Sequence, residues 1–280
     1  MKYAYYPGCS LESTGKEYDI SVRAAAESLG LELVELEDWN CCGATSAHSL
    51  DNHLALTLPA RNLGIAEKTG LDVTAPCAAC YNRMKTAEKA LKGDPKLRAE
   101  INKETGKDYE GNAAVYSLLE VFAGDEMKKR IAERVTLKLE GLKVACYYGC
   151  LLTRPAKVTG YDRYEDPQNM DEIMSLIGAE PVDWYFKTEC CGASFGVARA
   201  STVERLTAKI IEDARANGAD CVVTACPLCM TNLEMRQGEL NMPIFYFTEL
   251  LALALGSEGI QKCFASHLVD LNSALDKVMR

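Results

Sequence analysis

A motif with two adjacent cysteines occurs twice in this chain, as Asn-Cys-Cys-Gly-Ala at 40–44 and as Glu-Cys-Cys-Gly-Ala at 189–193. Each pair has a lone Gly-Cys upstream and a Cys-x-x-Cys downstream, and 34 residues separate the pair from the Cys-x-x-Cys in both halves. Cysteine thiolates bind soft metals and exchange electrons, so a repeated set predicts metal or redox chemistry. The two sets are Cys9, Cys41, Cys42, Cys77 and Cys80, and Cys150, Cys190, Cys191, Cys226 and Cys229.

Composition indicates what kind of protein carries this pattern. The chain has 280 residues, of which 25% are charged and 48% hydrophobic, and a net charge of −9. These values are typical of a globular protein large enough for a buried core, and the acidity argues against nucleic acid or an anionic membrane as the main partner. No apolar run is long enough to span a bilayer, and the chain opens on Met-Lys-Tyr without a signal-peptide pattern. We therefore expect a cytoplasmic protein without membrane insertion.

Ligand counting narrows the chemistry of the 13 cysteines. A disulfide framework belongs to short secreted chains that cannot build a core, so metal or redox chemistry is the better interpretation here. Structural zinc takes four ligands, whereas each half offers five cysteines and no recurrent histidine. A polynuclear iron–sulfur cluster accommodates the fifth thiolate. The usual ferredoxin spacing is absent, and zinc in one half remains an alternative.

Alternating strands and helices are expected to position these cysteines. Strand patterns cover 2–6, 32–36, 71–75 and 113–116, and each of the first three runs into a cysteine group. Helix patterns cover 17–29, 49–68 with an interruption at Pro59, 77–91 and 118–130, and a surface insertion covers 92–111. Because loops after parallel strands emerge at one edge of a sheet, distant cysteines should meet there.

The second half repeats this plan. Residues 2–9 align on 143–150 at an offset of 141, the cysteine pair and Cys-x-x-Cys align at an offset of 149, and the eight additional residues fall within 159–168. We predict an α/β protein with two pseudo-symmetric Rossmann-like domains, 1–140 and 141–280. Each domain would be a mainly parallel sheet flanked by helices, with the cysteine loops at the C-terminal strand edge.

The doubled pattern C-x31-39-CC-x34-C-x-x-C resembles the cysteine-rich CCG domains of heterodisulfide reductase B subunits over nearly the whole chain. The resemblance implies two noncubane 4Fe-4S clusters, one per domain, each held by five cysteines. It also implies that a disulfide, such as that of coenzyme M and coenzyme B, is reduced between them. All ten family cysteines are present, and the adjacent pairs Cys41, Cys42, Cys190 and Cys191 would act in catalysis through the clusters. Tyr148 replaces the proline of the first half, which should alter loop stiffness and not ligation.

Partner proteins and two other functions follow from the same resemblance. A B subunit receives electrons from a ferredoxin-like C subunit and, beyond it, a flavin-containing A subunit. CCG domains also occur in proteins of lactate, glycolate, glycerol-3-phosphate and succinate oxidation, so an electron-transfer subunit without its own substrate site is an alternative. A metal-free dithiol oxidoreductase working through the two Cys-x-x-Cys motifs is another.

A few further residues are candidates for the site. His48 follows the first cysteine pair and could supply a proton, although a lone histidine is more often structural. Basic residues near the cysteine loops could attract an anionic disulfide, or could simply be solvated surface. Arg83 and Arg199 are preferred for substrate binding; the others are Arg154, Lys157 and Lys187. Cys146, Cys221 and Cys263 have no counterpart in the repeat and are expected to be small core residues.

Overall fold

Two parallel four-stranded sheets form the centre of the molecule. The computed structural model describes residues 1–44 and 47–279. The first sheet has the order β2-β1-β3-β4 and the second the order β6-β5-β7-β8, with all neighbours parallel. The strands are β1 (Lys2–Tyr5), β2 (Glu32–Glu35), β3 (Val73–Ala75), β4 (Val115–Ser117), β5 (Lys143–Tyr147), β6 (Glu180–Pro181), β7 (Cys221–Thr224) and β8 (Ile244–Tyr246). The predicted fold class is confirmed, because the two sheets repeat one doubly wound order.

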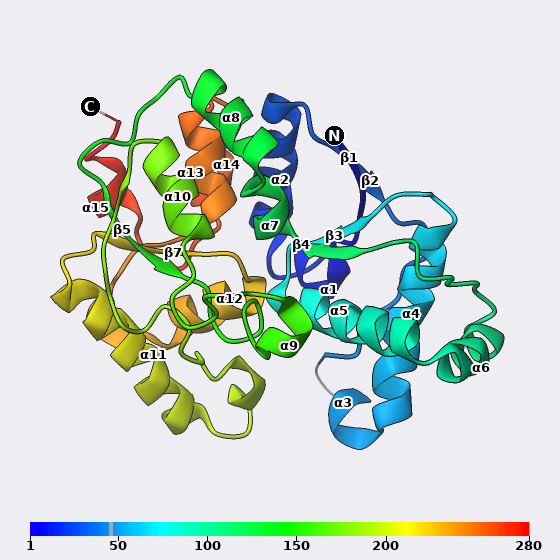
Figure 1. Ribbon diagram of the computed structural model, residues 1–280. Coiled ribbons are helices and arrows are strands. Elements are labelled where there is room, and N and C mark those ends of the chain that lie inside the picture. The colour runs from blue at the N-terminus through cyan, green and yellow to red at the C-terminus, as the bar shows by residue number, and fades with distance from the viewer. Residues whose placement is uncertain (45–46, 280) are drawn as a thin grey trace.

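Helices surround both sheets (Figure 1). Those of the first half are α1 (Gly8–Leu11), α2 (Lys16–Leu29), α3 (Ala47–Leu50), α4 (Asn52–Glu67), α5 (Ala78–Gly93), α6 (Pro95–Thr105), α7 (Leu118–Phe122) and α8 (Asp125–Arg134). Those of the second half are α9 (Ala156–Thr159), α10 (Asn169–Leu176), α11 (Ala200–Ala216), α12 (Pro227–Arg236), α13 (Phe247–Ala254), α14 (Gln261–Phe264) and α15 (Asn272–Leu275), with 3-10 turns η1 (Ala193–Phe195) and η2 (Gly238–Leu240). The strands β3, β7 and β8 are buried along their whole length, as expected for a sheet covered on both faces.

The two halves share a packed interface. Figure 1 shows α2, in blue, beside α13 and α14, in orange. The buried hydroxyls of Ser21 and Thr248 lie 2.7 Å apart across it, and the rings of Tyr18 and Tyr246 stack with centroids 4.0 Å apart. The ring of Phe122, from the first half, likewise packs edge-on against Phe247. A boundary between domains at 140/141 stays a prediction.

Two helix predictions were wrong. The helix expected over 49–68 is interrupted at Asp51 and not at Pro59, which lies inside α4, because the Asp51 carboxylate accepts the N–H of Leu54 at 2.6 Å and starts a new helix. The helix expected over 118–130 ends at α7 and restarts after Gly124 as α8. The insertion over 92–111 is largely exposed, as predicted, although it contains α6 and buries Ile101 completely.

Candidate functional site

The cysteine groups follow the strands as the sequence predicts. Cys9 lies in α1 directly after β1, the pair at 41–42 lies in the loop after β2, and Cys77 caps α5 after β3. The second half places its groups in the same way after β5, β6 and β7. In a parallel sheet these loops lie at one edge, next to the point where the strand order reverses, which is where doubly wound folds place their sites.

In the first half, the thiols contact one another in pairs. The Sγ atoms of Cys42 and Cys80 lie 3.2 Å apart, and the thiol of Cys9 interacts with that of Cys41. The backbone N–H of Gly43 points at Cys41 Sγ, at 3.4 Å. All five are free thiols, of which Cys9 and Cys41 are exposed and the other three are buried.

The second half reproduces this geometry. The Sγ atoms of Cys191 and Cys229 lie 3.7 Å apart, and those of Cys150 and Cys190 lie 3.9 Å apart. The N–H of Gly192 points at Cys190 Sγ, at 3.3 Å. The two halves therefore agree contact by contact, which indicates that the arrangement of thiols follows from the repeated sequence.

A glycine leaves room for one thiol in each half. Gly8 has φ +72°, and a Cβ atom added to it would lie 3.1 Å from Cys80 Sγ. Gly149 has φ +66°, and its added Cβ would also lie 3.1 Å from the Sγ of Cys229. Both the backbone conformation and the close approach favour glycine.

The two thiol sets meet at the interface between the halves. The thiols of Cys77 and Cys226, both buried, interact with each other. Tyr18 supports this junction from the α2 side, because its hydroxyl donates to the carbonyl of Ala225 at 3.3 Å. Ten cysteines that the sequence places in two groups are therefore continuous in space.

Buried tyrosines and amides support the loops that carry the adjacent pairs. Tyr6 donates its hydroxyl to the carbonyl of Asn40 at 2.9 Å, and Tyr147 donates to that of Glu189 at 2.6 Å. The Asn62 side chain brackets Asn40, accepting its N–H and donating to its carbonyl, both at 2.9 Å. Sequence reasoning missed these supports, although both tyrosines lie in the aligned segments that lead into Cys9 and Cys150.

Three of the thiols have a lowered pKa, and at the buried Cys226 the causes are hydrogen bonds from Cys229 and Cys77. A hydrogen bond from Cys80, opposed by burial and helped by Arg83, lowers the pKa of Cys42 to about 7. A hydrogen bond from Cys150, also opposed by burial and helped by Arg154, lowers the pKa of Cys190 to about 6. Thiolate is the form that binds metal, so each set holds at least one thiol close to that form at neutral pH.

The basic residues predicted from the sequence differ in whether they lie close to the cysteine thiols. Arg83 and Arg154 are half-buried and lie close enough to affect Cys42 and Cys190, and the Arg154 guanidinium also donates to the carbonyl of Thr188. Lys187 is buried and forms an ion pair with Asp171 at 2.9 Å.

The other candidates lie at the surface. Arg199 is exposed at the start of α11, and its side chain has no hydrogen bond or ion pair with any described residue. His48 is exposed in α3, with its ring 3.5 Å from the Ser49 hydroxyl, and Lys157 lies in α9, the helix that follows the Cys150 loop. Within the described residues, no hydrogen bond links any of these three to a cysteine. Cys146, Cys221 and Cys263 are buried, as expected.

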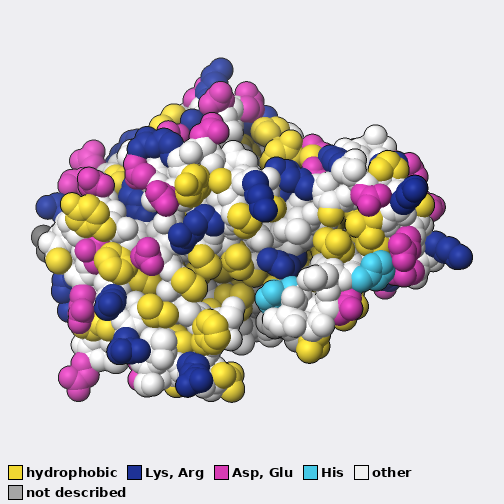
Figure 2. Space-filling view, turned by 60° about the horizontal axis from the view of Figure 1, so that its bottom comes forward, with side chains coloured by type: hydrophobic (Ala, Val, Ile, Leu, Met, Phe, Trp, Pro, Cys, Tyr) yellow, Lys and Arg dark blue, Asp and Glu magenta, His cyan; other side chains and the backbone are white. Residues whose placement is uncertain are grey.

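A hollow opens beside the second thiol set. It has a volume of about 580 Å³, and its lining includes Cys150, Arg154, Lys157 and Tyr164. A larger hollow of about 800 Å³ is lined by Lys128, Lys187 and other mostly polar residues, without any of the ten cysteines. Figure 2 shows a recess between the two lobes of the molecule, with several Lys and Arg side chains around it. The smaller hollow fits the chemistry better, since it combines a thiol with basic side chains.

Fold and site together define a two-part α/β protein with five clustered thiols in each part. A family model described as the CCG cysteine-rich domain matches residues 3–85 and 144–234. The chain therefore belongs to the CCG cysteine-rich domain family, with the domain present twice.

Curated relatives cover most of the chain. It is 34% identical over 266 residues to the "8-methylmenaquinol:fumarate reductase membrane anchor subunit" of Wolinella succinogenes, covering 91% of this chain and 92% of that protein. It is 32% identical over 273 residues to the B subunit of the ferredoxin/F(420)H(2)-dependent CoB-CoM heterodisulfide reductase of Methanosarcina acetivorans, covering 91% and 89%. The predicted resemblance to heterodisulfide reductase B subunits is confirmed.

A solved structure supports the fold. The crystal structure of a hypothetical protein from Helicobacter pylori matches 96% of this chain with a TM-score of 0.78 and 15% identity. This chain spans about half of that one, 52% of its length. Within 1–44 and 47–279, no helix is both long and apolar enough to cross a bilayer.

Proposed function

We propose that this chain is the iron–sulfur subunit of a heterodisulfide reductase-type complex and reduces a small disulfide, such as that of coenzyme M and coenzyme B. Each half would hold one noncubane 4Fe-4S cluster through its five cysteines. The observation that supports this most strongly is that two equivalent five-thiol sets meet at Cys77 and Cys226. The relatives named as heterodisulfide reductase B subunits support the same function.

The residues present fit such a cofactor. The donor sets are entirely sulfur, and the closest Sγ pairs are 3.2 to 3.9 Å apart, well beyond the roughly 2.05 Å of a disulfide bond. Each set also has a backbone N–H aimed at a thiol, from Gly43 and from Gly192, and hydrogen bonds to sulfur are one means by which proteins tune iron–sulfur clusters. Tyr6 and Tyr147 hold the loops that carry the adjacent pairs through hydrogen bonds to backbone carbonyls.

When bound, iron–sulfur clusters would supply one-electron transfer. The chain's own side chains then have defined roles. Arg83 and Arg154 give the thiol sets a positive surrounding that would attract an anionic disulfide, and Arg154 lines the hollow beside Cys150. Arg199 and His48 are exposed and free to approach a substrate, as a cation and as a proton donor.

The first test is metal content with single-cysteine variants. We expect about eight irons per chain after anaerobic purification, four in each half. Cys42→Ser should remove or convert one cluster and Cys191→Ser the other, as followed by iron analysis and electron paramagnetic resonance. Cys263→Ser, outside both sets, is the matched control. Full activity with zinc alone, or with no metal, would contradict the proposal and favour the dithiol alternative.

The second test is disulfide reduction with a reduced artificial electron donor. If both halves act on one substrate, Cys42→Ser and Cys191→Ser should each fall to background although the other cluster remains. Substantial turnover in either variant, or a covalent adduct between a cysteine and half of the substrate, would favour thiol exchange.

A second function has its own supporting observation. The Wolinella succinogenes relative is named as a subunit of a fumarate reductase, so this chain could transfer electrons in a dehydrogenase complex without binding a substrate. Eight irons with no disulfide reduction by any donor would select this function. Both functions require partners, and we propose a ferredoxin-like subunit and a flavin-containing subunit. Co-purification from the native source tests this.

A further inference from the structure

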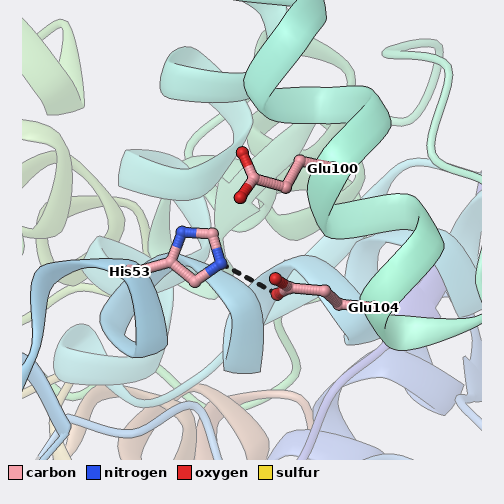
Figure 3. Close-up of side chains that lie close together, drawn as sticks. All are labelled: His53, Glu100 and Glu104. Atoms are coloured by element: carbon pink, nitrogen blue, oxygen red, sulfur yellow. Dashed lines mark hydrogen bonds and ion pairs between the residues drawn. The ribbon is translucent and has the colours of Figure 1, made fainter.

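A histidine and two glutamates converge on the surface of the first half, outside the thiol set (Figure 3). His53 lies in the first turn of α4, and Glu100 and Glu104 lie one turn apart on α6. His53 Nε2 is 2.8 Å from Glu104 Oε2, and one donor atom from each of the three residues lies within 4.8 Å of the other two. Spacing of i and i+4 places both carboxylates on the face of α6 that meets His53.

The charge of this group is not balanced by the protein. Within the described residues, no Lys or Arg lies within ion-pair distance of Glu100 or Glu104, and His53 is the cation that faces them. An exposed ion pair contributes little to stability. The ion pair explains why His53 and Glu104 lie together, but it does not explain why the Glu100 carboxylate also lies within 4.8 Å of both donor atoms.

We propose that His53, Glu100 and Glu104 bind a divalent first-row transition ion, through one imidazole nitrogen and two carboxylate oxygens. Imidazole with carboxylates suits ions from Mn²⁺ to Zn²⁺, whereas thiolates select softer metals, so this site and the cysteine sets differ in preference. Bonds of about 2.0–2.2 Å require the donor atoms to move closer together, which partly exposed side chains can do by changing rotamer. Water would complete the coordination.

The ion would join α6 to the N-terminal end of α4. Farther along α4, Arg61 donates to the Asn40 side chain and to Asp38, and Asn62 brackets the Asn40 backbone. Asn40 precedes the first cysteine pair. The site therefore lies at the end of the helix that positions this loop, and an ion there would act on structure without taking part in electron transfer.

Mn²⁺ is the probe that separates this site from the thiols, because it prefers oxygen and nitrogen ligands. Anaerobically purified protein is titrated with Mn²⁺, and free Mn²⁺ is measured by its six-line electron paramagnetic resonance signal. We expect one site per chain that His53→Ala and Glu100→Gln each weaken by more than about tenfold, equivalent to about 1.4 kcal/mol. The matched controls His48→Ala and Glu126→Gln, which change an exposed histidine and an exposed glutamate elsewhere, should retain it.

A second measurement covers the case in which a variant fails to fold. Hydrogen exchange of 95–105 should slow when Mn²⁺ is added to the original sequence, and should not change in Glu100→Gln, which keeps the shape of the side chain. Absence of a saturable site, or equal binding by the variants, would overturn the proposal. Mn²⁺ binding that persists in Cys42→Ser supports a site independent of the cysteines. Failure of the Mn²⁺ proposal is therefore distinguishable from failure of the proposed iron–sulfur function.

Discussion

Replacement of His267 by alanine should destabilise the protein strongly. The imidazole lies between two carboxylates, with Nδ1 2.7 Å from Glu234 Oε1 and Nε2 3.0 Å from Glu249 Oε1. The three side chains are 1%, 6% and 0% exposed, so the ion pairs are almost fully removed from water. Glu234 belongs to α12, the helix that carries Cys229, and Glu249 belongs to α13. His267 therefore ties the C-terminal segment to a helix of the second thiol set.

The magnitude follows from the charges that the variant leaves behind. Removing one member of a buried ion pair costs about 3–5 kcal/mol, because the partner stays buried without compensation. Burial alone would lower the pKa of His267, but hydrogen bonds to Glu234 and Glu249 outweigh it and raise the pKa to about 10. This rise in the pKa of His267 from its ordinary value of about 6.5 corresponds to a stabilisation of the folded state of the same order as that cost. Since whole domains are stable by about 5–15 kcal/mol, the loss would be a large fraction.

The assay is urea unfolding followed by circular dichroism under anaerobic conditions. With a slope of about 3 kcal/mol per molar urea, the midpoint should fall by about 1 M or more at pH 6.5. Because the folded-state pKa is raised, the stabilisation is fully present below about pH 6.5 and is lost as pH rises through about 10. The difference in urea midpoint between the original sequence and His267→Ala should likewise shrink as pH rises through about 10. His53→Ala removes an exposed His–Glu pair and should cost less than about 1 kcal/mol without added metal. A midpoint for His267→Ala equal to that of His53→Ala would refute the reasoning.

Two further predictions concern the glycines beside the thiols and the Glu67 carboxylate, which accepts three backbone N–H groups of one loop. Gly8→Ala and Gly149→Ala should each reduce the iron retained in their own half, because the new Cβ would lie 3.1 Å from a cysteine Sγ; Gly70→Ala, with a similar φ of +67° and open space around it, should cost only backbone strain of about 1–2 kcal/mol and leave iron content unchanged. Equal iron in all three variants would contradict this. Glu67→Ala should destabilise by about 2–3 kcal/mol and speed hydrogen exchange at 110–113, because its carboxylate accepts the N–H groups of Glu110, Asn112 and Ala113; unchanged exchange there would show that these hydrogen bonds are dispensable.

Local pattern was sufficient for the repeated unit. Short strands that run into cysteine groups predict parallel strands with converging loops, because a right-handed crossover brings every strand end to one edge. The observed order β2-β1-β3-β4, repeated as β6-β5-β7-β8, agrees with that expectation. Helix limits were less predictable, since the Asp51 cap competed successfully with a continuous apolar pattern.

The sequence alone also determined the membership of the two thiol sets, because their spacing repeats. What it could not determine is how the halves meet. Cys77 contacts Cys226 and Tyr18 stacks on Tyr246, although the residues of each pair are more than a hundred positions apart. His267 likewise joins glutamates from two separate helices. Such contacts depend on the shapes of two packed surfaces, which no local periodicity encodes. The same reason explains why Arg154 lies near the Cys190 thiol, whereas Lys187, which is also within four residues of a patterned cysteine, forms a buried ion pair with Asp171. Only the tertiary structure decides which basic side chain finds a buried partner.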